Sequence, residues 1–249
     1  ILMVKENQAE LKEQIEKVIQ LNKDGEKNKQ KYQEVIDLLT DEILDLEKSD
    51  VLYAEKSLAY YRIQKYTETK IEADRALQIN PNNSKALSIL GGYYYSFKKE
   101  NDKAEEYYKE ATIKDSENPL AYAGLGNLYH NQKDYQKAEE FYLKAILRNP
   151  EYANAYNGLG NLYFDQKNNR KAEECYKKAI DKNSEFVNPY NGLGNLYLIQ
   201  KDYKKAEEYY LKAILKDPEY VNAYNGLGNL YHDQKDYDEA EKFYLNAIE

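Results

Sequence analysis

A 34-residue period runs through most of this 249-residue sequence and constrains its fold more than any other feature. Alanine and tyrosine return at this step in separate columns: Ala104, Ala138, Ala172, Ala206 and Ala240; Tyr108, Tyr142, Tyr176, Tyr210 and Tyr244; Ala111, Ala145, Ala179, Ala213 and Ala247. A chain with such a period folds as a stack of small units, because one unit cannot bury its own apolar face and its neighbours bury it instead.

Each period predicts two helices. In the unit 153–186, the apolar residues of the first half lie at i, i+3, i+4 and i+7, which is one face of a helix: Tyr156, Leu159, Gly160 and Tyr163. The second half has helical spacing again: Ala172, Tyr176 and Ala179. A second helix ends near sequences such as Asp217-Pro218, because proline disfavours helix in the residue before it. The unit is therefore expected to be a helical hairpin.

This pattern resembles the tetratricopeptide repeat, whose signature is aromatic-x2-Leu-Gly-x2-Tyr, then Ala-x3-aromatic, then a further Ala. Tyrosine stands where that signature has tryptophan. Proline ends the units at Pro150 and Pro218, whereas serine replaces it at Ser116 and Ser184. The resemblance covers most of the chain. It implies an all-α, right-handed superhelical solenoid of antiparallel helical hairpins that acts as a protein–protein interaction scaffold.

We assign residues 50–249 to the solenoid, in these units: 50–83, 84–118, 119–152, 153–186, 187–220 and 221–249. The unit 84–118 holds one extra residue, which we place in the turn Phe97–Asp102. Residues 1–49 match the repeat poorly and are expected to form an N-terminal helical hairpin, either a degenerate repeat or a cap. Its apolar residues lie at helical spacing: Leu11, Ile15 and Val18 in one helix, and Val35, Leu38, Leu39 and Ile43 in the other.

Glycine at the Leu-Gly position costs a helix roughly 1 kcal/mol relative to alanine. We expect that Gly160, like its equivalents Gly126, Gly194 and Gly228, lets the partner helix approach closely, with a tyrosine filling the space. A second set of glycines is expected to widen the floor of a groove: Gly158, Gly192 and Gly226. Asp202 is expected to cap the helix that follows it.

The resemblance implies that the first helices line a concave groove and that the second helices form its outer wall. The residues expected on the groove are mostly asparagines: Asn127 and His130; Asn154, Asn157, Asn161 and Phe164; Asn188, Asn191, Asn195 and Leu198; Asn222, Asn225, Asn229 and His232. Asparagine is a middling-to-poor helix former, and its amide offers two donors and an acceptor. We predict that this stripe binds an extended peptide or a partner helix. Alternatively, repeat duplication copied the asparagines, and they support neighbouring helices.

The chemistry of the stripe favours an uncharged ligand, because Phe164, Leu198 and Ile199 add apolar contacts between the asparagines. Some members of the family instead grip a C-terminal carboxylate with lysines, asparagines and an arginine on their first helices. Lys85 matches one of those lysines. We do not expect that site here, because Glu55 and Ile89 stand where the resemblance requires asparagine and arginine.

Composition argues against several other functions. The net charge of -8 comes from acids and bases mixed along the helices, whereas nucleic-acid binding needs a clustered basic face. No run of about 18 apolar residues is present to span a bilayer. The single cysteine, Cys175, fits a reducing compartment, and we expect a cytoplasmic location.

Neither a catalytic constellation nor a metal site is apparent, so we expect no enzyme activity and no cofactor. The only histidines, His130 and His232, occupy the same position three units apart and cannot share a metal ion. Two alternatives remain for the function. The chain could be a structural array that self-associates through an uncapped C-terminal end. It could also be the substrate-recruiting arm of an enzyme whose catalytic domain lies outside this chain, which we take to be a fragment.

Overall fold

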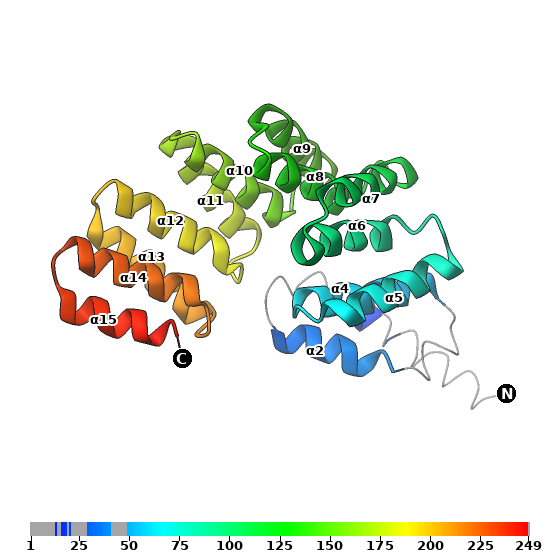
Figure 1. Ribbon diagram of the computed structural model, residues 1–249, viewed down its shortest axis with the longest axis horizontal. Helices are drawn as coiled ribbons and strands as arrows, with labels where there is room; N and C mark the ends of the chain where they lie inside the picture. Colours follow the sequence, from blue (N-terminus) through cyan, green and yellow to red (C-terminus); the bar gives the residue numbers. More distant parts are fainter. Residues whose placement is uncertain (1–12, 14–15, 19, 21–28, 41–48, 249) are drawn as a thin grey trace. The chain divides into compact units, whose positions relative to one another are not determined.

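The computed structural model describes residues 13, 16–18, 20, 29–40 and 49–248, and every element among them is helical (Figure 1). The chain divides into two compact units, residues 1–148 and 149–249, which are described separately below. The all-α fold predicted from the 34-residue period is confirmed.

The second unit consists of helical hairpins, in the order that the period predicts. Its helices are α10 (Ala153–Asp165), α11 (Asn169–Lys182), α12 (Val187–Ile199), α13 (Tyr203–Lys216), α14 (Val221–Asp233) and α15 (Tyr237–Asn246). Each first helix packs on the second helix of its own hairpin, and each hairpin packs on the next: α10 lies against α12, and α12 against α14. The first helices therefore form one row, in which each repeat contributes one step.

The first unit has the same hairpins and an additional helix at its N-terminal side. Its elements are α2 (Lys29–Leu38), α4 (Asp50–Arg62), α5 (Tyr66–Ile79), α6 (Ser84–Tyr93), the π-helical turn η1 (Tyr94–Lys98), α7 (Asn101–Lys114), α8 (Pro119–Asn131) and α9 (Tyr135–Arg148). Helix α2 packs on α4. The buried Val18, Val35 and Leu39 join Leu52 of α4 in one core cluster.

Part of the predicted N-terminal hairpin lies outside the described residues, including Leu11, Ile15 and Ile43. The separation of residues 1–49 from a solenoid at 50–249, with its individual repeat boundaries, stays a prediction.

One tyrosine ring fills the space left by two glycines in successive repeats. A Cβ atom on Gly160 would lie 2.5 Å from the ring of Tyr176, and one on Gly192, in the next hairpin, would lie 2.6 Å from the same ring. Tyr210 has the same relationship to Gly194 and Gly226. The expected role of Gly160 is thus confirmed. Gly192 and Gly226 do not widen a groove floor, because the rings of Tyr176 and Tyr210 in the preceding hairpins pack against them. That role stays a prediction for Gly158.

The turn inside each hairpin is tight. Lys201 has a left-handed conformation with φ 60, and the backbone N–H of Asp202 donates to the carbonyl of Tyr197, five residues earlier, at 3.0 Å. The Asp202 side chain then accepts from the backbone N–H of Lys205 at 3.2 Å. The predicted helix cap is confirmed, because this contact satisfies one of the free donors at the start of α13.

The extra residue of the repeat 84–118 lies in η1 and is not added to the loop. In this hairpin the N–H of Glu100 reaches back six residues, to the carbonyl of Tyr94 at 3.0 Å, where the regular turns reach back five. The left-handed residue is Lys99, at the same place relative to the next helix as Lys201. We predicted that the insertion lies in the turn Phe97–Asp102. This prediction is wrong for the residues after Lys98, where η1 ends and the turn has its regular geometry. A helix can absorb one residue as a π turn and leave the following turn unchanged.

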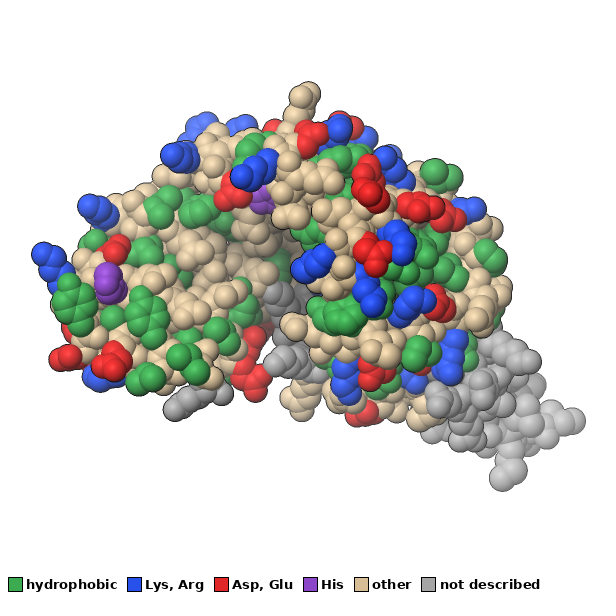
Figure 2. Space-filling model, viewed as in Figure 1, with side chains coloured by type: hydrophobic (Ala, Val, Ile, Leu, Met, Phe, Trp, Pro, Cys, Tyr) green, Lys and Arg blue, Asp and Glu red, His purple; other side chains and the backbone are tan. Residues whose placement is uncertain are grey.

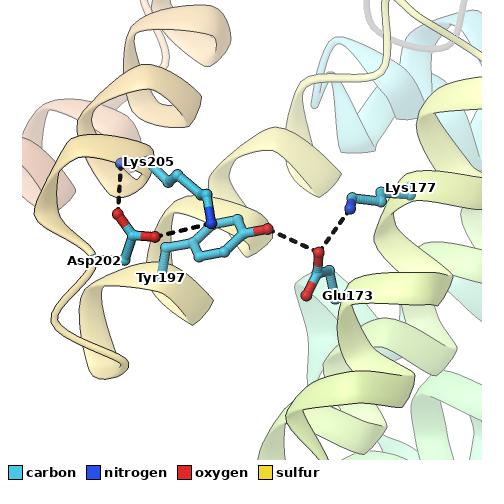
Figure 3. A network of polar contacts seen from close by, with 5 residues as sticks. All are labelled: Glu173, Lys177, Tyr197, Asp202 and Lys205. Carbon is cyan, nitrogen blue, oxygen red and sulfur yellow. Dashed lines mark hydrogen bonds and ion pairs between the residues drawn. The ribbon is translucent and has the colours of Figure 1, made fainter.

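A charged hydrogen bond links successive repeats of the second unit (Figure 3). The hydroxyl group of Tyr197 on α12 donates to Glu173 on α11 at 2.8 Å, and the same carboxylate pairs with Lys177 at 2.6 Å. The hydrogen bonds from Lys177 and Tyr197 lower the pKa of Glu173. The first unit repeats the contact between Tyr129 and Glu105, at 2.6 Å.

Candidate functional site

The predicted asparagine stripe lies on α10, α12 and α14, and we call this side of the second unit the first-helix face. Its members differ in exposure. Buried or half-buried positions are Asn154, Asn157, Phe164, Asn188, Asn191, Asn195 and Leu198, and exposed positions are Asn161, Asn222, Asn225, Asn229 and His232. Over α12 and α14, the visible surface is mainly hydrophobic and uncharged polar, with charged groups nearer its edges (Figure 2). In the first unit, Asn127 on α8 is exposed and His130 is half-buried.

Three asparagines at equivalent positions have the same hydrogen bond, and we call them the ladder: Asn161, Asn195 and Asn229. The hydroxyl of Tyr176 donates to Asn161 Oδ1 at 2.8 Å, that of Tyr210 to Asn195 Oδ1 at 2.7 Å, and that of Tyr244 to Asn229 Oδ1 at 2.7 Å. In each case the tyrosine belongs to the second helix of the same hairpin. The bond fixes the amide plane and engages its carbonyl oxygen, which leaves the Nδ2 donors for a ligand.

Burial of Tyr176 and Tyr210 keeps their hydroxyl groups protonated as donors of these hydrogen bonds. Desolvation raises the pKa of both Tyr176 and Tyr210 above the ordinary value, because a phenolate would be poorly solvated among apolar side chains. Their hydroxyl groups therefore keep their protons well above neutral pH. In the first unit, Tyr142 donates in the same way to Asn127 at 2.8 Å.

Three further asparagines of the face also have engaged or buried carbonyl oxygens. Asn188 Oδ1 accepts from the hydroxyl of Tyr220 at 2.9 Å. Asn157 is 7% exposed, and its Oδ1 atom is buried without a hydrogen-bond partner. Asn191, one repeat later, also has a buried Oδ1 atom without a partner. At these positions the face consequently presents no asparagine acceptor to a ligand.

Apolar and aromatic side chains lie among the asparagines. Phe164 and Leu198 are half-buried at the same position of successive repeats, and Ile199 is 55% exposed. His232 lies edge-on to the ring of Tyr237, with 5.5 Å between centroids. The two histidines were predicted as members of the stripe, and the structure gives each a tyrosine neighbour, since His130 also contacts Tyr135.

The tyrosines that orient the ladder were not among the predicted site residues. A signal for them is present in the sequence, because each ladder asparagine precedes its tyrosine by 15 residues in every regular repeat. We assigned the tyrosine column to packing alone. The hydroxyl group is the part of the side chain that connects this packing to the face.

The carboxylate-gripping arrangement does not form in the first unit. Lys85 Nζ lies 2.5 Å from the carboxylate of Glu55, which is 5% exposed, so an internal acid neutralises the lysine. Ile89 is 2% exposed. Both observations agree with the prediction, made from the sequence, that this site is absent.

An open pocket of about 450 Å³ lies on the other side of the second unit, between α11 and α13. Its apolar lining includes Ile180, Tyr190, Tyr209 and Leu215. The lysines around it are already paired with glutamates: Lys177 with Glu173, Lys212 with Glu208, and Lys216 with Glu185. Its rim therefore has no unpaired positive charge to attract an acidic ligand.

Among the residues that the structure describes, none of the helices has the length and apolar character needed to cross a membrane. Across the same residues, histidine, cysteine, aspartate and glutamate do not gather into a group that could hold a metal ion.

Comparison with known families identifies the class of protein. Two models described as tetratricopeptide repeat match the sequence, one over residues 117–183 and the other over 157–217 and 191–249. Together they extend from 117 to 249, which is more than half of the chain. The chain belongs to the tetratricopeptide repeat family, and its repeats make it a protein–protein interaction scaffold. Members of this family are typically non-catalytic scaffolds.

Solved structures show the same fold. A chain of the APC/C hetero-tetramer Cut9–Hcn1 superposes with a TM-score of 0.76 at 16% identity, over 93% of this chain and 45% of that chain. This chain thus spans less than half of that protein. PilF of Pseudomonas aeruginosa has a TM-score of 0.62 at 22% identity, over 79% and 89% of the two chains. MamA has a TM-score of 0.51 at 28% identity, over 64% and 92%. No curated protein matches the sequence.

Proposed function

We propose that the first-helix face binds a peptide segment of a partner protein through the amide groups of Asn161, Asn195 and Asn229. The observation that carries this proposal is the hydrogen bond from a tyrosine of the second helix to each ladder asparagine. A donor whose orientation is already fixed loses less conformational entropy when it binds a ligand. The ladder repeats once per hairpin, which suits a ligand that runs along the row of first helices.

Asn157 gives independent support for a binding role, because its side chain lowers the stability of the fold. An unsatisfied buried polar group costs about 1–3 kcal/mol, and Asn157 Oδ1 is such a group. The equivalent residue one repeat earlier is Ala123, which is 4% exposed, so a small apolar side chain suits this position. Residues that break a local rule of stability concentrate at functional sites.

The ladder favours an extended segment over a partner helix. The main-chain carbonyls in the interior of a helix are already engaged in its own i to i−4 hydrogen bonds, so they are poor acceptors for the ladder. An extended segment leaves its carbonyls available. Phe164 and Leu198 are half-buried beside the ladder and provide apolar contacts for its side chains.

The test uses a variant that keeps the tyrosine contact and removes the donors: Asn161→Asp/Asn195→Asp/Asn229→Asp. Aspartate has the same shape and still accepts from tyrosine, but it has no amide hydrogen. A phage-displayed peptide library is panned against the wild type and against this variant, after circular dichroism has shown equal helicity. We expect to recover peptides that bind the wild type and do not bind the variant. Recovery of the same peptides by both proteins, or of none by either, contradicts it.

A second candidate function, self-association, is favoured by the exposed apolar side chains of the last hairpin. Tyr237, Leu245 and Ile248 are 59%, 53% and 82% exposed. Sedimentation equilibrium between micromolar and hundred-micromolar concentrations tests this candidate. A rise in mass that Leu245→Lys abolishes supports it, and a constant monomer mass contradicts it.

A further inference from the structure

We propose that the segment bound by the first-helix face is in the polyproline II conformation, so that the partner is a proline-rich stretch of protein. This inference rests on the function proposed above and specifies its ligand. It follows from two properties of the ladder, the direction of its hydrogen bonds and the distance between its steps.

The first property is that five asparagines of the face have an engaged or buried carbonyl oxygen and offer a ligand their Nδ2 donors. The Oδ1 atoms of Asn161, Asn195 and Asn229 accept from tyrosine. Those of Asn157 and Asn191 are buried. A strand-like peptide places N–H donors alternately with its carbonyls, and these donors would find no free acceptor among the carbonyl oxygens of these five asparagines. A proline-rich segment has no N–H group at its prolines, so it meets this row of donors without leaving donors of its own unpaired.

The second property is the spacing of the donors. Ladder residues occupy the same position on α10, α12 and α14, and each of these helices lies against the next. Packed helices have axes about 8–10 Å apart, and from this general spacing we expect the donors to repeat at about that distance. Polyproline II has three residues per turn and a rise of about 3.1 Å per residue, so equivalent carbonyls on one side of it repeat every ~9.3 Å. The spacing expected for the donors matches this period of the ligand.

The alternative backbone conformations do not match this spacing. In a β-strand, carbonyls on the same side recur every second residue, which is about 6.6–6.8 Å. An α-helix repeats every ~5.4 Å and uses its interior carbonyls internally. Polyproline II has no internal hydrogen bonds, and its carbonyls are free to accept. One Nδ2 group per repeat therefore meets one carbonyl per turn of the ligand.

Apolar contacts complete the match. Phe164 and Leu198, one repeat apart and half-buried, lie beside the ladder on the same face. Proline rings pack well on such side chains, as in other grooves that recognise polyproline II segments with apolar and aromatic residues.

Fluorescence anisotropy with a labelled peptide that has no charged side chains tests the inference. The probe is a fluorescein-labelled oligoproline of about twelve residues, and the comparison peptide is a labelled Gly-Ser repeat of equal length, which is flexible. Each is titrated with the wild type, with Asn161→Asp/Asn195→Asp/Asn229→Asp, and with the control Asn246→Asp on the exposed end of α15. We expect oligoproline to bind the wild type at least tenfold more tightly than the Gly-Ser peptide. The ladder variant should weaken binding at least tenfold, and the control should change it less than twofold.

Absence of oligoproline binding, equal affinity for the two probes, or equal affinity of the wild type and the ladder variant overturns the inference. Titration with peptides from the phage library distinguishes failure of this inference from failure of the proposed function. Should panned peptides still depend on the ladder while oligoproline does not bind, the polyproline II ligand is wrong and the binding face stands. Should neither depend on the ladder, both are wrong.

Discussion

The hydroxyl group of Tyr176 donates a 2.8 Å hydrogen bond to Oδ1 of Asn161, and this contact connects the core of a repeat to its surface. The ring of Tyr176 is 2% exposed between Gly160 and Gly192. The asparagine gives the hydroxyl a partner, and the hydroxyl gives the asparagine a fixed orientation. Because the bond recurs in successive hairpins, the packing that stabilises the stack also sets the direction of the surface donors.

Replacement of Tyr176 by phenylalanine separates these two roles. The ring still fills the space between the glycines, but Asn161 loses the donor that orients it. We expect Tyr176→Phe to lower the free energy of unfolding by about 0.5–1.5 kcal/mol, the usual net value of one hydrogen bond, and to weaken peptide binding. Urea denaturation and a peptide titration measure the two effects. Tyr209→Phe is the control, because Tyr209 stacks on Tyr197 and is not part of the ladder. Equal losses in both variants would contradict this role.

Asn157→Ala tests whether that buried asparagine is present for stability. The substitution removes an acceptor without a partner and copies the equivalent Ala123. We expect the free energy of unfolding to stay the same or to rise by up to about 1 kcal/mol, because relief of the buried group offsets the lost packing. Ser57→Ala is the comparison, since Ser57 is buried and donates to the carbonyl of Thr69 at 2.7 Å; it should lose about 1 kcal/mol. A loss above 1 kcal/mol for Asn157→Ala would show that the asparagine is structural.

Gly192→Ala tests the two-glycine packing. Alanine favours a helix by up to about 1 kcal/mol over glycine, but its Cβ atom would lie 2.6 Å from the ring of Tyr176. Overpacking of a core typically costs about 1–3 kcal/mol, so we expect a net loss of about 1–2 kcal/mol in urea denaturation. Lys178→Ala, on the exposed side of α11, gives the effect of alanine without a clash and should be near neutral. Stabilisation by Gly192→Ala would contradict the packing.

The pairing of Gly160 with Tyr176 could be predicted from the sequence because both residues share one hairpin and one period. The contact of Tyr176 with Gly192 could not, since it depends on how far one hairpin is shifted along the next. A repeat period predicts that the units stack, but it does not predict how far one hairpin is shifted along the next. The extra residue in the repeat 84–118 is a similar case. The sequence gives its existence, whereas the choice between a longer loop and the π turn Tyr94–Lys98 depends on the helix geometry.

The asparagine stripe was predicted from its spacing. The differences in exposure and amide direction among its members were not predicted. Helical periodicity places Asn157 and Asn161 on neighbouring parts of one face. It does not show that Asn157 is 7% exposed while Asn161 is exposed, because that difference comes from the helix packed alongside. The direction of each amide group also depends on a partner 15 residues away, which a helical wheel cannot represent.

Acid should weaken the coupling between repeats through Glu173. Hydrogen bonds from Lys177 and Tyr197 hold its pKa below the ordinary value. A carboxyl group whose pKa is lower in the folded state stabilises the fold above the unfolded-state pKa, about 4.3, and this stabilisation is lost as the pH falls through the folded-state pKa. We expect the free energy of unfolding to fall less between pH 7 and pH 3 in Glu173→Gln than in the wild type. Glu174→Gln, at an exposed position, should keep the wild-type dependence, and the same slope in both variants would contradict the assignment.

The orientation of the ladder can be observed directly by NMR of asparagine side chains. In protein labelled with 15N-asparagine, single Asn→Asp substitutions assign the amide signals of Asn161, Asn195 and Asn229, and a peptide recovered by panning is then titrated. We predict that the three ladder signals shift together as the peptide binds, because their Nδ2 groups donate to it, while the signal of Asn246 stays in place. Binding that leaves the ladder signals unchanged would contradict the claim that these amides are the recognition element.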